Sequence, residues 1–234
     1  TVAEAFATAK NGDEVVILKA GNYAVPTGKS ITITGAVDGV EFNCGQNNIG
    51  LNGASITFNN VTFNWAANGW PYHGLAHCGD MEYNDCTFNG TVFLYGTSET
   101  FNNCKFNVTG DTYNVWTYSA NKATFNGCTF NSDGKALLIY HEGASQFNEV
   151  TITDCDFIAN SAVTGKAAIE MDSSLTAGIS LTIDADTTAT GFGTGNVSGN
   201  SLWNNKKGSN TDANNDITVV VNNETVLAPV TFAA

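Results

Sequence analysis

The side chains best suited to chemistry are the carboxylates of Glu170 and Asp172, which lie two residues apart in one apolar segment. Residues two apart on a β-strand point to the same face, so both carboxylates are expected to share one surface. Glu142 follows His141 at the end of a similar segment. Such a cluster matches glycoside cleavage, which needs two carboxylates at a defined separation. The interpretation we favour is a solvated acidic edge, because acidic pairs are common on protein surfaces.

Aromatic side chains form the second group of candidates. Trp and Tyr combine an apolar ring with a polar tip, and exposed rings on a rigid β surface are a common means of stacking sugar rings. The alternative is that the rings fill the core, where aromatic residues are usually found. The candidate ligand-binding residues are Trp70, Tyr72, His73, Tyr95, Trp116, Tyr118, Tyr140 and His141.

These side chains must be positioned by a short motif that recurs five times. It reads aromatic or Ile, two turn-forming residues, Cys or Val, one polar residue, Phe and usually Asn. The spacing varies between 18 residues, from Cys86 to Cys104, and 27 residues, from Cys128 to Cys155. A constant motif at unequal intervals indicates stacked coils joined by loops of different length, which is typical of a solenoid.

Cys and Phe two positions apart have the period of a β-strand, and the preceding Asn pair suits a corner. Coils stacked about 4.8 Å apart would bring equivalent residues into columns. The expected inward sulfur column is Val61, Cys86, Cys104, Cys128 and Cys155. The expected ring column is Phe63, Phe88, Phe106, Phe130 and Phe157. The expected amide ladder is Asn59, Asn84, Asn102 and Asn126.

The first residues predict an end cap: an amphipathic helix, the pair Gly12-Asp13, the apolar strand 15–18, and the triplet Gly21-Asn22-Tyr23. This opening and the Asn corners resemble the pectin-lyase-like superfamily. The resemblance implies an all-β fold, a single-stranded right-handed parallel β-helix (solenoid) with a short N-terminal capping helix. We expect one domain over residues 1–234. Its parts would be an N-cap helix at 1–12, coils at 13–190, and an irregular C-terminal coil and cap at 191–234.

Known enzymes of this superfamily argue against catalysis. Its pectate lyases typically combine calcium-binding aspartates with an arginine base, and this sequence contains no arginine. The Asn-Thr-Asp, Asp-Asp and Gly-His-Gly series of polygalacturonases is not present as a set, because Asp-Asp and Gly-His-Gly do not occur. His73 and His77 would suit zinc only on a helix, and the cysteines of the column are better explained as small buried apolar residues. We therefore expect no metal and no cofactor.

The orientation of one further set of strands decides where the candidate residues lie. These strands are expected at 92–95, 115–118, 137–140 and 168–171. Glu170 and Asp172 should avoid a dry core, which places Ile169 and Met171 inward. When these segments are aligned residue by residue, four aromatic rings point inward together with Ile169 and Met171. If the strands instead have the opposite orientation, the same rings form an exposed ladder. The rings concerned are Phe93, Tyr95, Trp116 and Tyr118.

The composition limits the partners. Net charge is −13 and all nine basic residues are lysines, which argues against nucleic acid. The longest aliphatic run, 15–18, is too short for membrane insertion. We expect a secreted or surface-displayed bacterial or phage protein that binds glycan or another surface partner without catalysis, as an adhesin does. The alternatives are a lyase or hydrolase of acidic polysaccharide and a passive stalk. The apolar outer face also predicts self-association, end to end or side by side.

Overall fold

The structure is a computed structural model. It describes residues 1–45, 49–65, 74–76, 78–117, 122–141, 148–160, 166–173, 178–195, 198–205 and 217–228. The side chains of residues 74–76, 141 and 173 lie outside this description.

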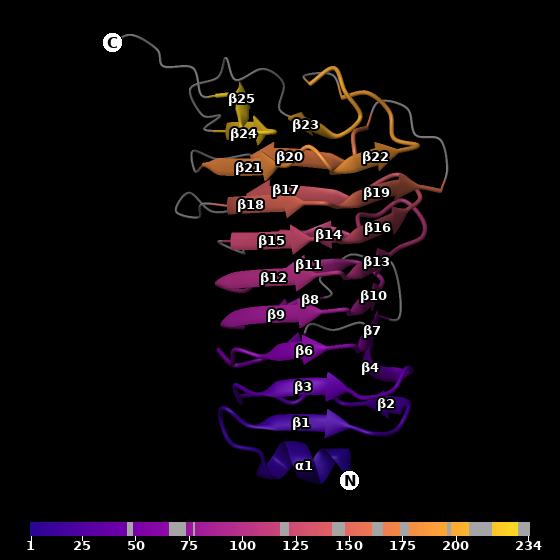
Figure 1. Ribbon diagram of the computed structural model, residues 1–234, viewed down its shortest axis with the longest axis vertical. Helices are drawn as coiled ribbons and strands as arrows, with labels where there is room; N and C mark the ends of the chain where they lie inside the picture. The colour runs from indigo at the N-terminus through magenta and orange to yellow at the C-terminus, as the bar shows by residue number, and fades with distance from the viewer. Residues whose placement is uncertain are drawn as a thin grey trace.

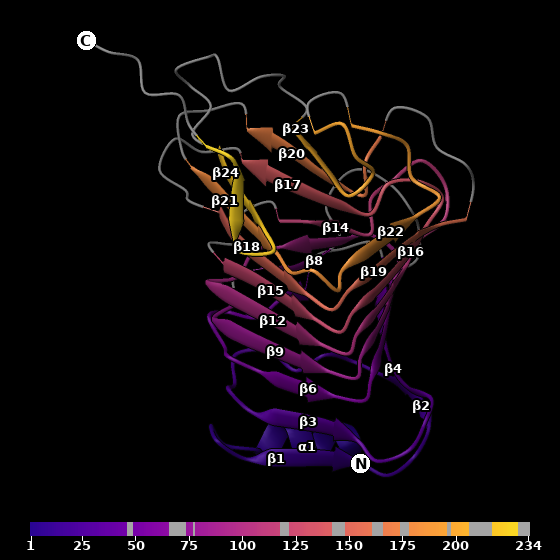
Figure 2. The same cartoon turned by 45° about the horizontal axis from the view of Figure 1, so that its top comes forward.

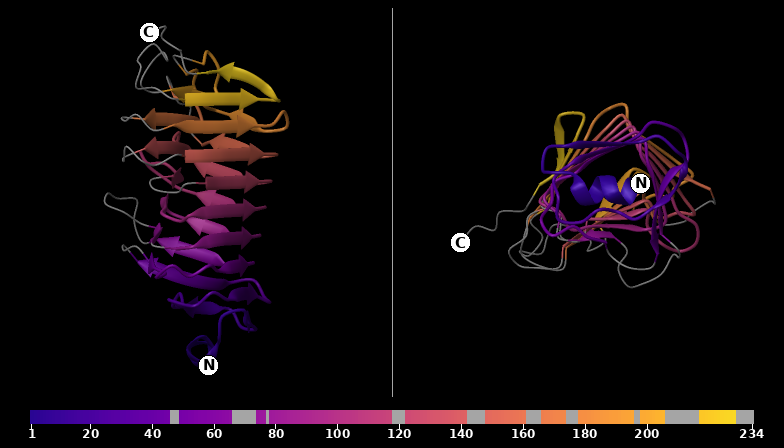
Figure 3. Two further views of the ribbon diagram at one scale, coloured as in Figure 1. Left: turned by 90° about the vertical axis from the view of Figure 1, so that its left-hand side faces the viewer. Right: turned by 90° about the horizontal axis from the view of Figure 1, so that it is seen from below.

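The predicted N-terminal helix is present as α1 (Val2–Thr8), shorter than expected. Thr1 starts it with a capping box: its Oγ1 accepts from the backbone N–H of Glu4 at 3.2 Å, and the Glu4 carboxylate accepts from the Thr1 amino group at 2.7 Å. Phe6 is the buried residue of the helix. The helix lies across one end of the molecule, where it covers the interior (Figures 1 and 3).

The described strands belong to three sheets, which the chain visits in turn. The ten-stranded sheet contains, in spatial order, β1 (Glu14–Ile17), β3 (Thr32–Gly35), β6 (Thr57–Asn59), β9 (Asp80–Asn84), β12 (Ser98–Asn102), β15 (Lys122–Asn126), β18 (Asn148–Thr153), β21 (Ile179–Ile183), β24 (Ile217–Val221) and β25 (Glu224–Leu227). The eight-stranded sheet contains β2 (Gly21–Tyr23), β4 (Val40–Gly45), β7 (Thr62–Trp65), β10 (Thr87–Asn89), β13 (Lys105–Asn107), β16 (Thr129–Ser132), β19 (Asp156–Ala159) and β22 (Thr188–Thr190). The seven-stranded sheet contains β23 (Trp203–Asn205), β20 (Ile169–Ser173), β17 (Leu137–His141), β14 (Val115–Trp116), β11 (Val92–Leu94), β8 (Gly74–Ala76) and β5 (Ile49–Gly50).

Neighbouring strands in these sheets run parallel, and the pair β24 and β25 at the C-terminal end is antiparallel. Successive strands of each sheet are stacked along the long axis (Figures 1 and 2). The view along that axis shows the sheets enclosing one interior (Figure 3). The fold is therefore all-β with parallel stacked sheets, an arrangement compatible with the predicted parallel β-helix.

The interior contains the predicted column of phenylalanine rings. Strand register pairs Phe63 with Phe88, then Phe106, Phe130 and Phe157 in succession. Adjacent ring centroids are 4.5 to 5.1 Å apart, and the ring planes differ by 8 to 13°. All five side chains are completely buried. The alternation of Phe with polar residues thus produces one continuous stack in the core.

A second stack runs beside the first on the ten-stranded sheet. It comes from the aromatic residue at the start of the motif, and its centroids are 4.7 to 5.6 Å apart. Rings of the two stacks meet edge to face, an arrangement that aromatic pairs favour. The members of the second stack are Phe58, Tyr83, Phe101 and Phe125.

The corner between the two sheets explains the turn-forming pair. Its second member has a left-handed backbone in all five copies of the motif, with φ between 51 and 63°, which Asn, Asp and Gly tolerate best. These residues are Asn60, Asp85, Asn103, Gly127 and Asp154. The cysteine that follows points inward, and its Sγ donates to a carbonyl oxygen of the preceding coil at 3.4 to 3.5 Å. The predicted sulfur column is therefore confirmed, and its thiols are free.

Two amide ladders flank this corner. In the predicted ladder, each Asn Nδ2 donates to the Oδ1 of the Asn one coil earlier at 2.8 to 2.9 Å. A second ladder, which we did not predict, has the same geometry at 2.8 to 3.0 Å. The first ladder contains Asn59, Asn84, Asn102 and Asn126. The second contains Asn64, Asn89, Asn107 and Asn131.

Candidate functional site

The seven-stranded sheet corrects the prediction of which side chains face outward. Ile169 and Met171 are completely buried, as expected. However, Ile169 pairs with Leu137, whereas our alignment paired it with Leu138, and Leu138 pairs with Glu170. A slip of one residue moves a whole strand to the other face.

The aromatic residues therefore share the outer face with the carboxylates. Phe93 pairs with Trp116, and Trp116 pairs with Leu138 in the Glu170 column. Tyr95 follows the inward Leu94, and its ring contacts that of Phe93. Their predicted inward orientation is wrong, and Tyr118 lies outside the described residues.

A cavity of about 300 Å³ opens on this outer face. Trp116, Leu138 and Glu170 form its central column, and Tyr140 pairs with Asp172 two residues further along the strands. Tyr113, Lys135 and Lys166 line it from segments that precede the strands. The structure thus brings together four of the predicted site residues, namely Trp116, Tyr140, Glu170 and Asp172.

The Glu170 carboxylate is the most enclosed charged group of the cavity, with 4% of the residue exposed. The Tyr113 hydroxyl donates a short hydrogen bond to its Oε2. Burial raises the pKa of Tyr113, and the neighbouring Glu170 raises it further. Tyr113 therefore stays a neutral donor at physiological pH, which holds the carboxylate in place.

Two lysines line the cavity near Tyr113. The Lys135 Nζ lies 2.6 Å from Asp111 Oδ1 and 5.7 Å from the centre of the Tyr113 ring. Partial burial lowers the pKa of Lys166, and the nearby Lys135 ammonium lowers it further. Hydrogen bonding to Lys135 lowers the pKa of Asp111. The lysine side of the cavity is thus a cluster of charges in which two cations lie close together.

The rings around the cavity meet at steep angles. Trp116 and Tyr113 are perpendicular with centroids 5.6 Å apart, and Trp116 and Tyr140 are inclined by 60° at 5.8 Å. Phe93, one coil earlier, stacks against Trp116 with ring centroids 5.2 Å apart and supports it. Inclined rings present both faces and edges to the space between them, whereas the inner stacks use both faces against each other.

Apart from Tyr95, the remaining predicted site residues have side chains outside the described part of the chain. His141 ends β17, where its backbone pairs with Ser173, and its side chain is not described. Within the described part of the chain, no three His, Cys, Asp or Glu side chains are placed to hold a metal ion. The predicted residues outside the described part are Trp70, Tyr72, His73, Tyr118 and Glu142.

Sequence reasoning missed Tyr113, Lys135 and Lys166 as site residues. Lys135 and Lys166 precede the paired strands β17 and β20 by two and three residues, respectively. A lysine shortly before each strand was the available signal, although the true register, which pairs Leu137 with Ile169, offsets the two lysines by one residue. Tyr113 had no such signal because no repeated motif includes it.

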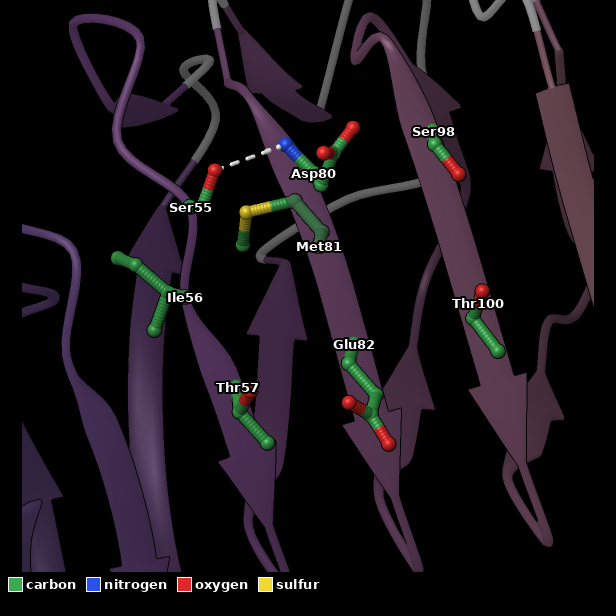
Figure 4. Close-up of a pocket in the computed structure, with 8 residues that line it drawn as sticks. All are labelled: Ser55, Ile56, Thr57, Asp80, Met81, Glu82, Ser98 and Thr100. Atoms are coloured by element: carbon green, nitrogen blue, oxygen red, sulfur yellow. Dashed lines mark hydrogen bonds between the residues drawn. The ribbon is translucent and has the colours of Figure 1, made fainter. Parts of the chain in front are cut away.

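A second hollow lies on the ten-stranded sheet, with a volume of about 460 Å³ (Figure 4). The side chains of Thr57, Glu82 and Thr100 follow one another across its strands (Figure 4). They belong to an outer column in which threonine recurs, which we did not predict. The threonines of this column are Thr32, Thr57, Thr100, Thr124, Thr151 and Thr182. The charge of Glu82 interrupts the column, which by itself identifies no ligand.

One acidic residue points into the core. Glu99 is completely buried, and its Oε1 accepts from the Gly96 N–H at 3.1 Å and from the Cys78 thiol at 3.5 Å. Its Oε2 has no hydrogen-bond partner among the described residues. Burial raises the pKa of Glu99 to about 8. The carboxyl group is therefore mostly neutral at pH 7.

No family model, curated protein or solved structure matches this chain. In the described part, none of the helices has the length and apolar character needed to cross a membrane.

Proposed function

We propose that the chain is a right-handed parallel β-helix of the pectin-lyase-like type whose outer cavity binds a glycan without cleaving it. The observation that carries the proposal is the combination of Trp116 and Tyr140 with Glu170 and Asp172 around one cavity. Sugars are bound by such sites because a ring packs against their apolar faces while carboxylates accept hydrogen bonds from their hydroxyl groups. A rigid solenoid that binds glycan suits a secreted or surface-displayed protein.

Binding without cleavage is the preferred function because of the contacts that hold the Glu170 side chain. The carboxylate is buried and accepts a hydrogen bond from Tyr113, a donor whose raised pKa keeps it protonated. A carboxylate held in this way is positioned as a fixed acceptor. The raised pKa also makes Tyr113 a poor general base at neutral pH.

The proposal is tested on a glycan array with the whole protein. We expect a defined subset of glycans to bind, and Trp116→Ala to weaken their binding at least tenfold. Tyr23→Ala is the matched control, because Tyr23 is also half-buried but lies on β2 in the eight-stranded sheet. The proposal is wrong if no glycan binds, or if the two variants bind equally well.

Polysaccharide cleavage is the second candidate, because Glu170 and Asp172 do line the same cavity, as a pair of catalytic carboxylates must. It predicts that incubation with acidic polysaccharides releases reducing or unsaturated ends, and that Asp172→Asn abolishes the release. Glu82→Gln is the control, because this carboxylate lies in the hollow of the ten-stranded sheet. Release that Asp172→Asn leaves intact would exclude this assignment.

A further inference from the structure

The cavity on the seven-stranded sheet has two ends of opposite charge. Lys135 and Lys166 line it from segments that precede β17 and β20. Asp172 and Tyr140 line it near the last residues of the same strands. A ligand that lies along the strand direction would therefore meet ammonium groups at one end and a carboxylate at the other.

The lysine end suits an anion. Two ammonium groups held close together repel each other, and Lys166 shows this repulsion in a pKa lowered by burial and by Lys135. Asp111 contacts Lys135 and also attracts Lys166, but its side chain is 87% exposed, so solvent screens its charge. It therefore balances the two positive charges only in part. A bound phosphate or carboxylate between the lysines would remove the repulsion.

The opposite end suits an organic ammonium group. Trp116 and Tyr140 are inclined at 60° to each other, and the carboxylate of Asp172, which pairs with Tyr140, lines the same space. Aromatic walls attract a cation through the negative faces of the rings, and this arrangement recognises quaternary ammonium groups in particular. The adjacent Asp172 carboxylate adds direct charge attraction.

We infer that the cavity binds a zwitterionic sugar substituent, with its anionic group at Lys135 and Lys166 and its ammonium group between Trp116, Tyr140 and Asp172. This inference rests on the proposed function and specifies its ligand class. Phosphocholine attached to a glycan has the required chemistry, because it carries a phosphate and a quaternary ammonium group on one short linker. Neither a neutral sugar nor a simple polyanion uses both ends of the cavity.

Titration calorimetry with phosphocholine, choline chloride and inorganic phosphate at equal ionic strength tests the inference. Phosphocholine is expected to bind at least tenfold more tightly than choline or phosphate. Lys166→Gln should weaken phosphate and phosphocholine binding and leave choline binding unchanged. Asp172→Asn should weaken choline and phosphocholine binding and leave phosphate binding unchanged. Tyr140→Leu gives a second test of the ammonium end if Asp172→Asn fails to fold.

The controls are Lys122→Gln and Asp80→Asn, which change the same charges on the ten-stranded sheet and should leave all three affinities unchanged. The inference is overturned if phosphocholine binds no more tightly than its two halves, or if both cavity variants weaken both halves equally. Array binding that requires Trp116, together with no phosphocholine binding, overturns the inference and leaves the proposed function standing. Phosphocholine binding with the expected variant pattern, but no binding of any glycan, overturns the proposed function instead.

Discussion

Aromatic rings occur in two regions of this protein, and their geometry differs. Inside, the planes of stacked rings such as Phe106 and Phe130 are parallel to within about 10°, and both side chains are completely buried. Outside, Trp116 and Tyr113 are perpendicular and border a cavity that also contains charged groups. The inner rings fill space against one another, whereas the outer rings leave space between them. Aromatic rings therefore fill the core in one region, and in the other they border the cavity that we propose as a binding site.

The largest expected effect is on the inner stack. Phe106→Ala should lower the free energy of unfolding by about 3–5 kcal/mol, because it removes a buried ring and leaves a cavity between Phe88 and Phe130. Chemical denaturation measures the change, and Phe106→Leu should recover a large part of it. A loss below about 1 kcal/mol would mean that the stack contributes little to stability.

The next prediction concerns the pH dependence of stability, for which we compare the inner carboxyl group of Glu99 with the outer carboxylate of Glu170. Because the pKa of Glu99 is about 8 in the folded protein and 4.5 is its ordinary value, the folded state binds more protons than the unfolded state between these values. Stability should therefore fall as pH rises through this window, by up to about 1.4 kcal/mol per pH unit.

Glu99→Gln should remove this contribution, so its unfolding free energy should fall less steeply than that of the wild type between pH 5 and pH 8, approximately the window set by the shifted group. Denaturant melts across this range measure the difference in slope. Glu170→Gln is the control and should retain the wild-type contribution of Glu99. Identical slopes for Glu99→Gln and the wild type would show that the inner carboxyl does not carry the effect.

A smaller loss of stability is expected at the corner between the ten-stranded and eight-stranded sheets. Asn102→Ala removes the donor to Asn84 and the acceptor for Asn126, both at 2.8 Å. The loss should be about 1–3 kcal/mol, because partly buried amides lose their partners. Asn22→Ala, at an exposed position on β2, should have little effect. Equal melting temperatures for the two variants would show that the ladder does not stabilise the fold.

The smallest effect on stability is expected at the outer rings. Trp116→Ala should cost about 1 kcal/mol, since the ring is only half-buried, while ligand binding is expected to fall at least tenfold. Thermal melts and binding measurements on the same sample separate the two effects. A stability loss as large as that of Phe106→Ala would remove the distinction between the inner and outer rings.

The core columns were predictable because the motif carries its own register. Cys104 and Phe106 lie two residues apart in the sequence, and every copy of the motif repeats that spacing. No alignment across loops was needed to place both residues inward. The second amide ladder was missed although its members end the same motif, because we assigned the corner to the first Asn alone.

The outer site was predictable only in part, because its strands have no common motif. The segments joining β14, β17 and β20 differ in length, so the pairing of Leu137 with Ile169 is set by packing rather than by a local signal. An error of one residue was enough to turn Phe93 and Trp116 toward the wrong face. Glu170 and Asp172 were placed correctly because burying two carboxylates of one strand in a dry core is costly, although Glu99 shows that a single carboxyl group can enter it.

The side-chain dipoles of the amide ladders all point the same way along the molecule. From Asn84 to Asn131 every Asn in them donates toward the N-terminal end, and all but the last of each ladder, Asn126 and Asn131, also accept from the C-terminal side. The side-chain dipoles therefore add along the axis, as peptide dipoles do in an α-helix. The two ends of a ladder therefore differ: a coil that stacks on the C-terminal side meets an Oδ1 acceptor, whereas a coil on the N-terminal side meets an Nδ2–H donor.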